Sequence, residues 1–196
     1  MALPNNSLSS PYIPGELDSA DKFIRSPLTI DYELGGSAIQ MPSNDIFYVW
    51  KTKVIGNDIF ITKYPYTYDT YLLSDTDITE VSLAFDQSMR PYLAYKSGNH
   101  TKLWWYDTSI PGQTTTDYGV NIKSSFLSLD DKRKSSNSIN DVLFFYIENS
   151  KLYYRQQRDR FQTARELYTF TGPDVTILRV GLSDKLRMQI EVKDSN

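Results

Sequence analysis

The residue types that carry most enzyme chemistry are scarce in this chain of 196 residues. Histidine occurs once, as His100 in the turn segment 97–100, and cysteine does not occur. A nucleophile–histidine–acid triad needs these groups close together, and a single histidine makes a poor metal site. We therefore expect no catalytic residue, no metal ligand and no cofactor, and we interpret His100 as a solvated turn residue.

Carboxylates are frequent, but their positions have a structural explanation. Asp86, Asp130 and Asp184 each follow an apolar run, where an aspartate can accept a hydrogen bond from the backbone of the next turn. Asp75 and Asp77 resemble a fragment of a calcium loop, yet the glycine and the terminal glutamate of such a loop are missing. The pattern favours turn stabilisation over acid–base chemistry.

Three arginines give the most specific prediction of a contact site. Arg155, Arg158 and Arg160 follow an aromatic strand, and the basic run 132–134 would add to the same patch. Arginine pairs with carboxylates, stacks on aromatic rings and concentrates binding energy at protein interfaces. We predict that these three arginines bind a partner; the alternative is a solvated hairpin in which Asp159 partly neutralises the charge.

The elements that must position these residues are β-strands in a repeating order. Turn residues separate short apolar or alternating runs, and no window keeps a helical period over three turns. The repeated units lie near 37–75, 81–118, 125–170 and 174–192. Each of the first three ends in a weaker fourth strand, near 70–73, 114–118 and 166–170, whereas the last unit stops after two strands.

This repeat predicts the fold class. A period of about 45 to 50 residues is typical of four-stranded propeller blades. Middle strands such as 142–147 are continuous apolar runs, as expected for a strand that is buried on both faces. We predict an all-β fold of propeller-like, four-stranded units, about four blades in all, with a β-sandwich as the alternative.

The N-terminal segment differs from the rest of the chain. Residues 1–27 contain four prolines and little periodicity, so we interpret them as an extended arm, either disordered or ordered on a neighbouring subunit. Residues 28–196 then form a single β domain. Because the last unit lacks two strands, we expect 22–24 and 28–34 to supply them and to hide its edges. In particular, 28–34 should pair with the sheet that holds 186–192.

Composition narrows the range of partners. The net charge is -3, which argues against general nucleic-acid binding because that function needs a basic surface. The chain starts without a basic or apolar leader, and no stretch approaches the roughly 20 apolar residues of a membrane helix. We expect a protein made in the cytoplasm, with no nucleic acid and no membrane among its partners.

Two aromatic runs raise the possibility of glycan binding. Trp104-Trp105-Tyr106 and Tyr153-Tyr154 place rings on both faces of a strand. Core packing is the favoured interpretation for Trp105 and Tyr154, since at least one face of each strand should be buried. When the units are aligned by eye, Phe60, Trp104 and Tyr153 share a column, so the aromatic pattern is repeated only in part.

Several segments resemble one known family. They are 85–95, 129–133, 141–146, 152–161 and 178–182, within a region that spans 81–192. These segments are similar to virion structural proteins of tailed bacteriophages. The resemblance implies assembly into the virion at the tail, with other virion proteins and copies of the same chain as partners. It implies no active site.

Together these observations predict a non-enzymatic structural component of a phage virion that acts through protein–protein assembly. The alternative is a β-propeller module that binds a host glycan, as a lectin or receptor-binding domain. A lectin would repeat the same aromatic and polar pocket in every blade, whereas an assembly protein needs contact surfaces for its neighbours.

Overall fold

The computed structural model describes residues 23–25, 35–41, 46–64, 68–86, 90–129, 141–183 and 188–194. Within these residues the chain forms antiparallel sheets and one short 3-10 helix, η1, at Gln157–Asp159. The first sheet comprises β2 (Gly35–Met41), β3 (Ile46–Ile55), β4 (Asp58–Tyr64) and β5 (Asp69–Ser74). The second comprises β6 (Ile78–Phe85), β7 (Pro91–Ser97), β8 (His100–Tyr106) and β9 (Gln113–Asp117).

The third sheet comprises β10 (Ile122–Leu129), β11 (Val142–Glu148), β12 (Lys151–Gln156) and β13 (Arg165–Thr169). The fourth contains β1 (Phe23–Arg25), β14 (Val175–Ser183) and β15 (Met188–Asp194), in the order β1-β14-β15. Strands in the first three sheets follow one another in chain order. The all-β fold and the repeated four-stranded unit are therefore confirmed, including the weak fourth strands β5, β9 and β13.

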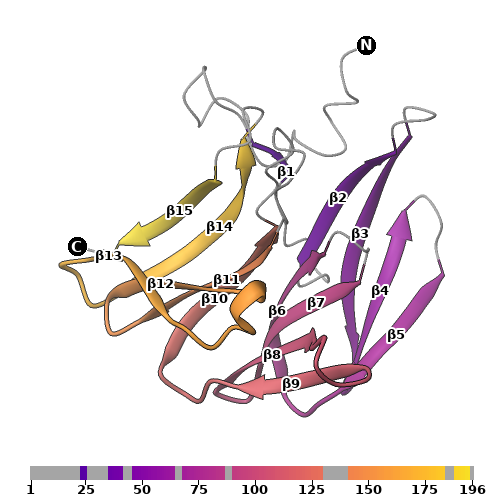
Figure 1. The fold of residues 1–196 in the computed structure, drawn as a ribbon, viewed down its shortest axis with the longest axis horizontal. Coiled ribbons are helices and arrows are strands. Elements are labelled where there is room, and N and C mark those ends of the chain that lie inside the picture. Colours follow the sequence, from indigo (N-terminus) through magenta and orange to yellow (C-terminus); the bar gives the residue numbers. More distant parts are fainter. Residues whose placement is uncertain are drawn as a thin grey trace.

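Successive sheets contact one another through β2, β6, β10 and β14. We call these the first strands, because each begins one of the repeated units. β6 contacts both β2 and β10, and β10 in turn contacts β14. Figure 1 shows the sheets fanned out from this line of first strands, with β5, β9 and β13 at outer positions. This order is compatible with a propeller-like or a sandwich arrangement of the sheets.

An apolar cluster fills each space between successive sheets. Between the first and second sheets lie Ile59, Leu83, Leu93 and Tyr95. Between the second and third lie Tyr92, Trp105, Phe144 and Phe161. Between the third and fourth lie Phe145, Ile147, Val175 and Ile177. Alternate residues of β11 enter the second and third of these clusters, so this strand is buried on both faces, as its apolar run predicts.

The two chain ends meet in the fourth sheet. Phe23 and Arg25 of β1 pair with Ser183 and Leu182 of β14, and β1 also contacts β2. An N-terminal strand near 22–24 thus joins the C-terminal sheet, as expected, although it falls within the predicted arm 1–27. The other predicted strand, 28–34, lies outside the described residues, as do residues 1–22.

The hairpin turns correct one alignment made from the sequence. β3–β4, β7–β8 and β11–β12 each close on a two-residue turn, where Gly56, Gly98 and Asn149 have positive φ. This geometry suits two-residue hairpins. Counting from the closing pair, the residue equivalent to Phe60 and Tyr153 is Lys102. The expected column with Trp104 is therefore wrong by two residues, because ring content is a weaker guide to register than the turn.

Candidate functional site

The three predicted contact arginines lie at the junction of the second and third sheets. Arg155 is on β12, Arg158 is in η1, and Arg160 follows η1 in the left-handed region with φ 58°. Phe161 repeats that conformation at φ 56°, an unusual backbone for a bulky residue. The two consecutive left-handed residues turn the chain so that the Phe161 ring enters the core.

Arg155 connects β12 to its neighbour β11, to the loop at 161–162 and to Tyr118, which follows β9. Its guanidinium donates hydrogen bonds to the Tyr146 hydroxyl (3.2 Å) and to the carbonyl oxygens of Phe161 (3.0 Å) and Gln162 (2.5 Å). It also lies 4.9 Å from the centre of the Tyr118 ring, within the range of a cation–π contact. Burial raises the pKa of the Tyr118 hydroxyl to about 12, so this ring stays neutral beside the arginine.

Arg158 and Arg160 neutralise two buried carboxylates. Arg158 pairs with Asp141 and Arg160 with Asp107, whose side chains are only 2% and 4% exposed, whereas the arginine side chains are about half exposed. Hydrogen bonds from Ser109, and then the bond from Arg160, lower the pKa of the Asp107 carboxyl. These arginines therefore have an internal role that sequence reasoning missed, because each partner lies far away in the sequence.

The rest of the predicted basic patch is arranged differently. Asp159 pairs with Arg165 at 2.7 Å rather than serving only as a counter-charge to the three arginines. The basic run 132–134 lies outside the described residues. The structure thus brings the three arginines to one junction. Their role in binding a partner, through the exposed parts of their side chains, stays a prediction.

The carboxylates stabilise turns and junctions. Asp86 accepts hydrogen bonds from the backbone N–H of Arg90 (2.9 Å) and from its guanidinium Nε (2.7 Å), as predicted for an aspartate after a strand. Asp130 and Asp184 lie outside the described residues. His100 is exposed, and its Nδ1 lies 2.9 Å from Asp117.

Asp75 joins the first sheet to the second. It accepts hydrogen bonds from the Tyr95 hydroxyl (3.0 Å), the Ser97 hydroxyl (2.9 Å), the Lys102 ammonium (2.7 Å) and the backbone N–H of Thr76 (2.8 Å). Burial alone would raise the pKa of this carboxyl, but the four hydrogen bonds outweigh burial and lower the pKa to about 2. An Asp-rich segment that resembled a calcium loop is thus a junction between sheets.

The aromatic runs are mostly internal. Trp104 and Trp105 are buried, and the Trp105 Nε1 donates to the Thr116 hydroxyl at 3.0 Å. Tyr153 and Tyr154 are half-buried. Core packing is therefore confirmed for Trp105, while Tyr154 packs only partly against the cluster between the third and fourth sheets.

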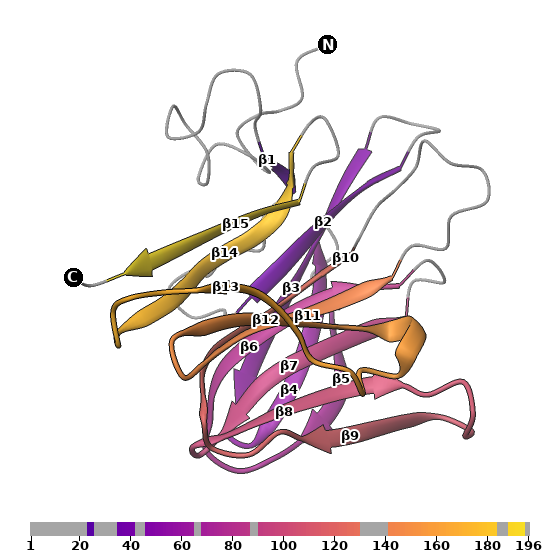
Figure 2. The ribbon, with the colours of Figure 1, turned by 60° about the vertical axis from the view of Figure 1, so that its left-hand side comes forward.

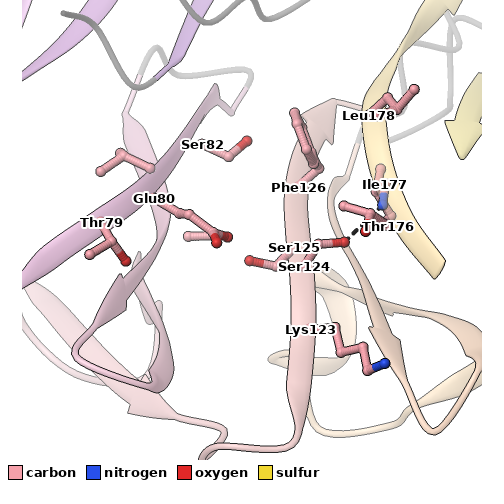
Figure 3. Close-up of a pocket in the computed structure, with 12 residues that line it drawn as sticks. Thr79, Glu80, Ser82, Lys123, Ser124, Ser125, Phe126, Thr176, Ile177 and Leu178 are labelled. Carbon is pink, nitrogen blue, oxygen red and sulfur yellow. Dashed lines mark hydrogen bonds between the residues drawn. The ribbon is translucent and has the colours of Figure 1, made fainter. Parts of the chain in front are cut away.

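A groove of about 270 Å³ lies between the first strands β6, β10 and β14 (Figure 3). Its polar lining includes Thr79, Glu80, Ser82, Lys123, Ser124, Ser125 and Thr176, and its apolar lining includes Val81, Phe126, Ile177 and Leu178. Sequence reasoning missed this groove because its walls come from three different units. No alternation in 122–129 signalled it, because Ser124 and Ser125 are adjacent and lie on opposite faces of the strand.

Two buried serines join the walls of the groove by accepting hydrogen bonds. Ser82 on β6 accepts a hydrogen bond from the backbone N–H of Leu127 on β10 at 2.9 Å. Ser124 on β10 accepts one from the backbone N–H of Ile177 on β14 at 2.8 Å, the dashed line in Figure 3. One hydroxyl on β6 and one on β10 thus each accept a hydrogen bond from a backbone N–H of the next sheet.

Charges around the groove are already paired. The Lys96 ammonium donates to Glu80 (3.0 Å) and to the carbonyl oxygen of Lys123 (2.7 Å). The Lys123 ammonium donates to the carbonyl oxygen of Pro173 (2.5 Å) and lies 3.2 Å from Asp174. The groove consequently offers hydroxyl groups and apolar surface with little net charge.

Two other classes of site are absent from the described residues. No three metal-ligating side chains come together there, and no helix there is long and apolar enough to cross a membrane. No family model, curated protein or solved structure matches this chain.

Proposed function

We propose that this chain is a non-enzymatic structural component of a tailed-phage virion, located at the tail and acting through protein–protein assembly. The resemblance to virion proteins supports this proposal. Two of the segments that carry the resemblance, 85–95 and 152–161, meet at the junction between the second and third sheets, where Gln157 donates to the Tyr92 hydroxyl at 2.8 Å. The partners we propose are other virion proteins and further copies of the chain.

The observation that carries the assembly role is the exposure of aromatic and apolar side chains on outer strands. Tyr71 on β5 is 54% exposed, and Leu167 and Tyr168 on β13 are 47% and 60% exposed. Tyr68, just before β5, is also exposed. Tyrosine is enriched at protein interfaces because it combines a large apolar ring with a polar end. Since β5 and β13 belong to different sheets, they offer two separate contact surfaces.

The direct test is to find the protein in purified particles. Virions washed at high salt should retain the chain at a fixed copy number, measured by quantitative mass spectrometry. The double variant Tyr71→Ser with Tyr168→Ser should fold normally and be depleted from particles. Val120→Ser is the matched control, because Val120 is also about half exposed but lies in a loop. A wild-type chain that is absent from washed virions would overturn the proposal.

The groove favours a second candidate function, recognition of a host glycan. Thr79, Ser125 and Thr176 place hydroxyl groups in its lining, and none of these hydroxyls is hydrogen-bonded to another described residue. Phe126 adds an aromatic ring, which can pack against the apolar face of a sugar. Paired charges at the rim suit a neutral sugar rather than an acidic one.

A panel of neutral monosaccharides and disaccharides tests this candidate by saturation-transfer NMR. Binding should be lost in Ser125→Ala and Thr79→Ala, and kept in Thr163→Ala, which removes an exposed hydroxyl elsewhere. No saturation transfer from the wild-type protein to any sugar in the panel would remove the glycan function and leave the assembly function unaffected.

A further inference from the structure

Two small side chains lie next to each other in the lining of the groove between β6, β10 and β14. Ser82 on β6 and Ala94 on β7 are directly paired across the two strands, so their side chains share one face of the sheet. Both line the groove, and they are only 3% and 1% exposed. Figure 2 shows β10 between β6 and β14, which are the walls of this groove. The paired serine and alanine therefore form a buried floor on the β6 side.

The Ser82 hydroxyl has a donor that is not used within the described part of the chain. A serine hydroxyl can accept two hydrogen bonds and donate one. The Ser82 oxygen accepts from the backbone N–H of Leu127, but its own O–H donates to no described residue. An unpaired buried donor is costly. The floor of the groove therefore favours a bound molecule that brings a hydrogen-bond acceptor.

The charges at the groove disfavour an anionic acceptor. The Glu80 carboxylate lines the groove, and a carboxylate or phosphate on a ligand would be repelled by it. Two cations lie near the groove, and both already have partners within the chain. Lys96 donates to Glu80 and to the carbonyl oxygen of Lys123, and Lys123 donates to the carbonyl oxygen of Pro173. The acceptor that suits Ser82 is therefore neutral.

A carbonyl oxygen suits this floor better than a sugar hydroxyl. A hydroxyl would bring its own O–H to a buried position, where that donor also needs a partner, whereas a carbonyl oxygen only accepts. The Ala94 methyl group beside Ser82 offers an apolar contact for a methyl group. An acetamido group carries a carbonyl and a methyl together, and the hydroxyl oxygens of Thr79 and Ser125 in the same lining can accept its N–H. The volume of about 270 Å³ suits a single sugar unit.

We propose that the groove binds a neutral N-acetylated sugar, whose acetamido carbonyl accepts a hydrogen bond from the Ser82 hydroxyl and whose acetamido methyl packs against Ala94. This inference rests on the glycan recognition proposed above and names the class of sugar. The Phe126 ring in the lining is available to the apolar face of the sugar ring. The acetamido group is thus the feature by which the groove distinguishes its ligand from other neutral sugars.

NMR titration of the full chain with N-acetylglucosamine and, separately, with glucose tests the proposal, because the two sugars differ only in the acetamido group. The wild-type protein should bind N-acetylglucosamine roughly tenfold more tightly than glucose. Ser82→Ala should abolish this preference by weakening the binding of N-acetylglucosamine alone. Ser97→Ala is the matched control and should keep the preference. Ser97 is also a buried serine of the second sheet, but its hydroxyl donates to Asp75 at 2.9 Å, outside the lining of the groove.

Equal affinity of the wild-type protein for the two sugars would overturn this inference and leave glycan recognition standing. This comparison needs no variant, so it decides the question even if Ser82→Ala does not fold. A preference that survives in folded Ser82→Ala would also overturn the inference. Tighter binding of N-acetyl-triglycine amide, which has the same amide group but no sugar ring, would assign the groove to an extended peptide instead. Binding of no sugar at all would remove glycan recognition together with this inference.

Discussion

Two regions of the molecule differ in how completely their groups are paired. One is the junction between the second and third sheets, and the other is the fourth sheet. At the junction, buried aromatic rings interlock, with Phe161 5.3 Å from Trp105 and 6.3 Å from Tyr92 between ring centres. The Tyr92 hydroxyl and the Asp107 carboxylate both have partners there. In the fourth sheet, by contrast, the five residues 188–192 are half-buried and 193–194 are exposed.

This difference predicts which changes affect the stability of the fold and which affect assembly with other chains. At the junction, the guanidinium groups of Arg155, Arg158 and Arg160 already have partners within the chain, so these groups gain little from binding another protein. A sheet with an open edge and partly covered apolar side chains gains hydrogen bonds and apolar burial when another strand is added. We therefore expect changes at the junction to alter the free energy of unfolding, and changes at β15 to alter association.

The largest expected effect is at Phe161. Its side chain is 1% exposed, and replacing a buried phenylalanine with alanine costs about 3–5 kcal/mol of unfolding free energy. Urea unfolding of Phe161→Ala, followed by circular dichroism, should show this loss. Tyr168→Ala is the matched control, since its ring is 60% exposed, and it should change stability by less than about 0.5 kcal/mol. Equal losses of unfolding free energy in the two variants would contradict the stabilising role of the buried junction.

Arg158 gives the next largest effect. If the arginine were a free surface charge, its reversal would leave the fold intact. Because it pairs with the buried Asp141, Arg158→Glu should instead cost about 2 kcal/mol, since it leaves a buried carboxylate without its partner and beside a like charge. Lys151→Glu reverses a cation in a more exposed pair with Glu166 and should cost less. Chemical unfolding that ranks the two variants the other way would contradict the internal role of Arg158.

Asp75 extends the comparison to the junction between the first and second sheets. Its pKa in the folded protein is lowered to about 2, so the stabilisation is present above the unfolded pKa near 4 and is lost as the pH falls towards 2. Asp75→Asn should lower the unfolding free energy by roughly 1–2 kcal/mol at neutral pH.

The difference from wild type should shrink as the pH falls from about 4 to about 2, where the wild-type carboxyl also becomes protonated. Unfolding curves at both ends of this window measure it. Asp174→Asn, at a carboxylate whose side chain is 74% exposed, should show no comparable change. A constant difference across the window would mean that charge on Asp75 does not stabilise the junction.

The smallest expected effects come from the two serines that join first strands. Ser82→Ala and Ser124→Ala each leave one backbone N–H without its acceptor, on Leu127 and Ile177 respectively, at a cost of about 1 kcal/mol. Amide hydrogen exchange should separate them. Ser124→Ala should speed exchange in β14 and β15 alone, whereas Ser82→Ala should affect the second and third sheets together. Identical exchange patterns would show that the fourth sheet is no looser than the others.

Local signals explain why the strands could be predicted from the sequence. The expected fourth strand at 70–73 lies within β5 (Asp69–Ser74), and that at 114–118 overlaps β9 (Gln113–Asp117). Glycine and asparagine turns and alternating residues determine such positions within a few residues of chain. The burial of β11 on both faces could be predicted for the same reason, because a continuous apolar run is visible in the sequence alone.

The candidate sites could be predicted only in part, because their partners are distant in the sequence. Arg160 pairs with Asp107 and Lys102 with Asp75, contacts that form only once successive sheets pack together. The groove needs residues from β6, β10 and β14, and no local pattern places these three strands side by side. The arginines were therefore recognised as important, but their internal carboxylate partners were not.

Amide hydrogen exchange of the pure wild-type protein tests the central claim most directly, by comparing β15 with β11. The account predicts that β11 is strongly protected, because it is paired on both edges. It predicts that β15 exchanges faster, because among the described residues only β14 pairs with it. Protection of β15 that equals that of β11 would contradict a fourth sheet that is less completely paired than the others.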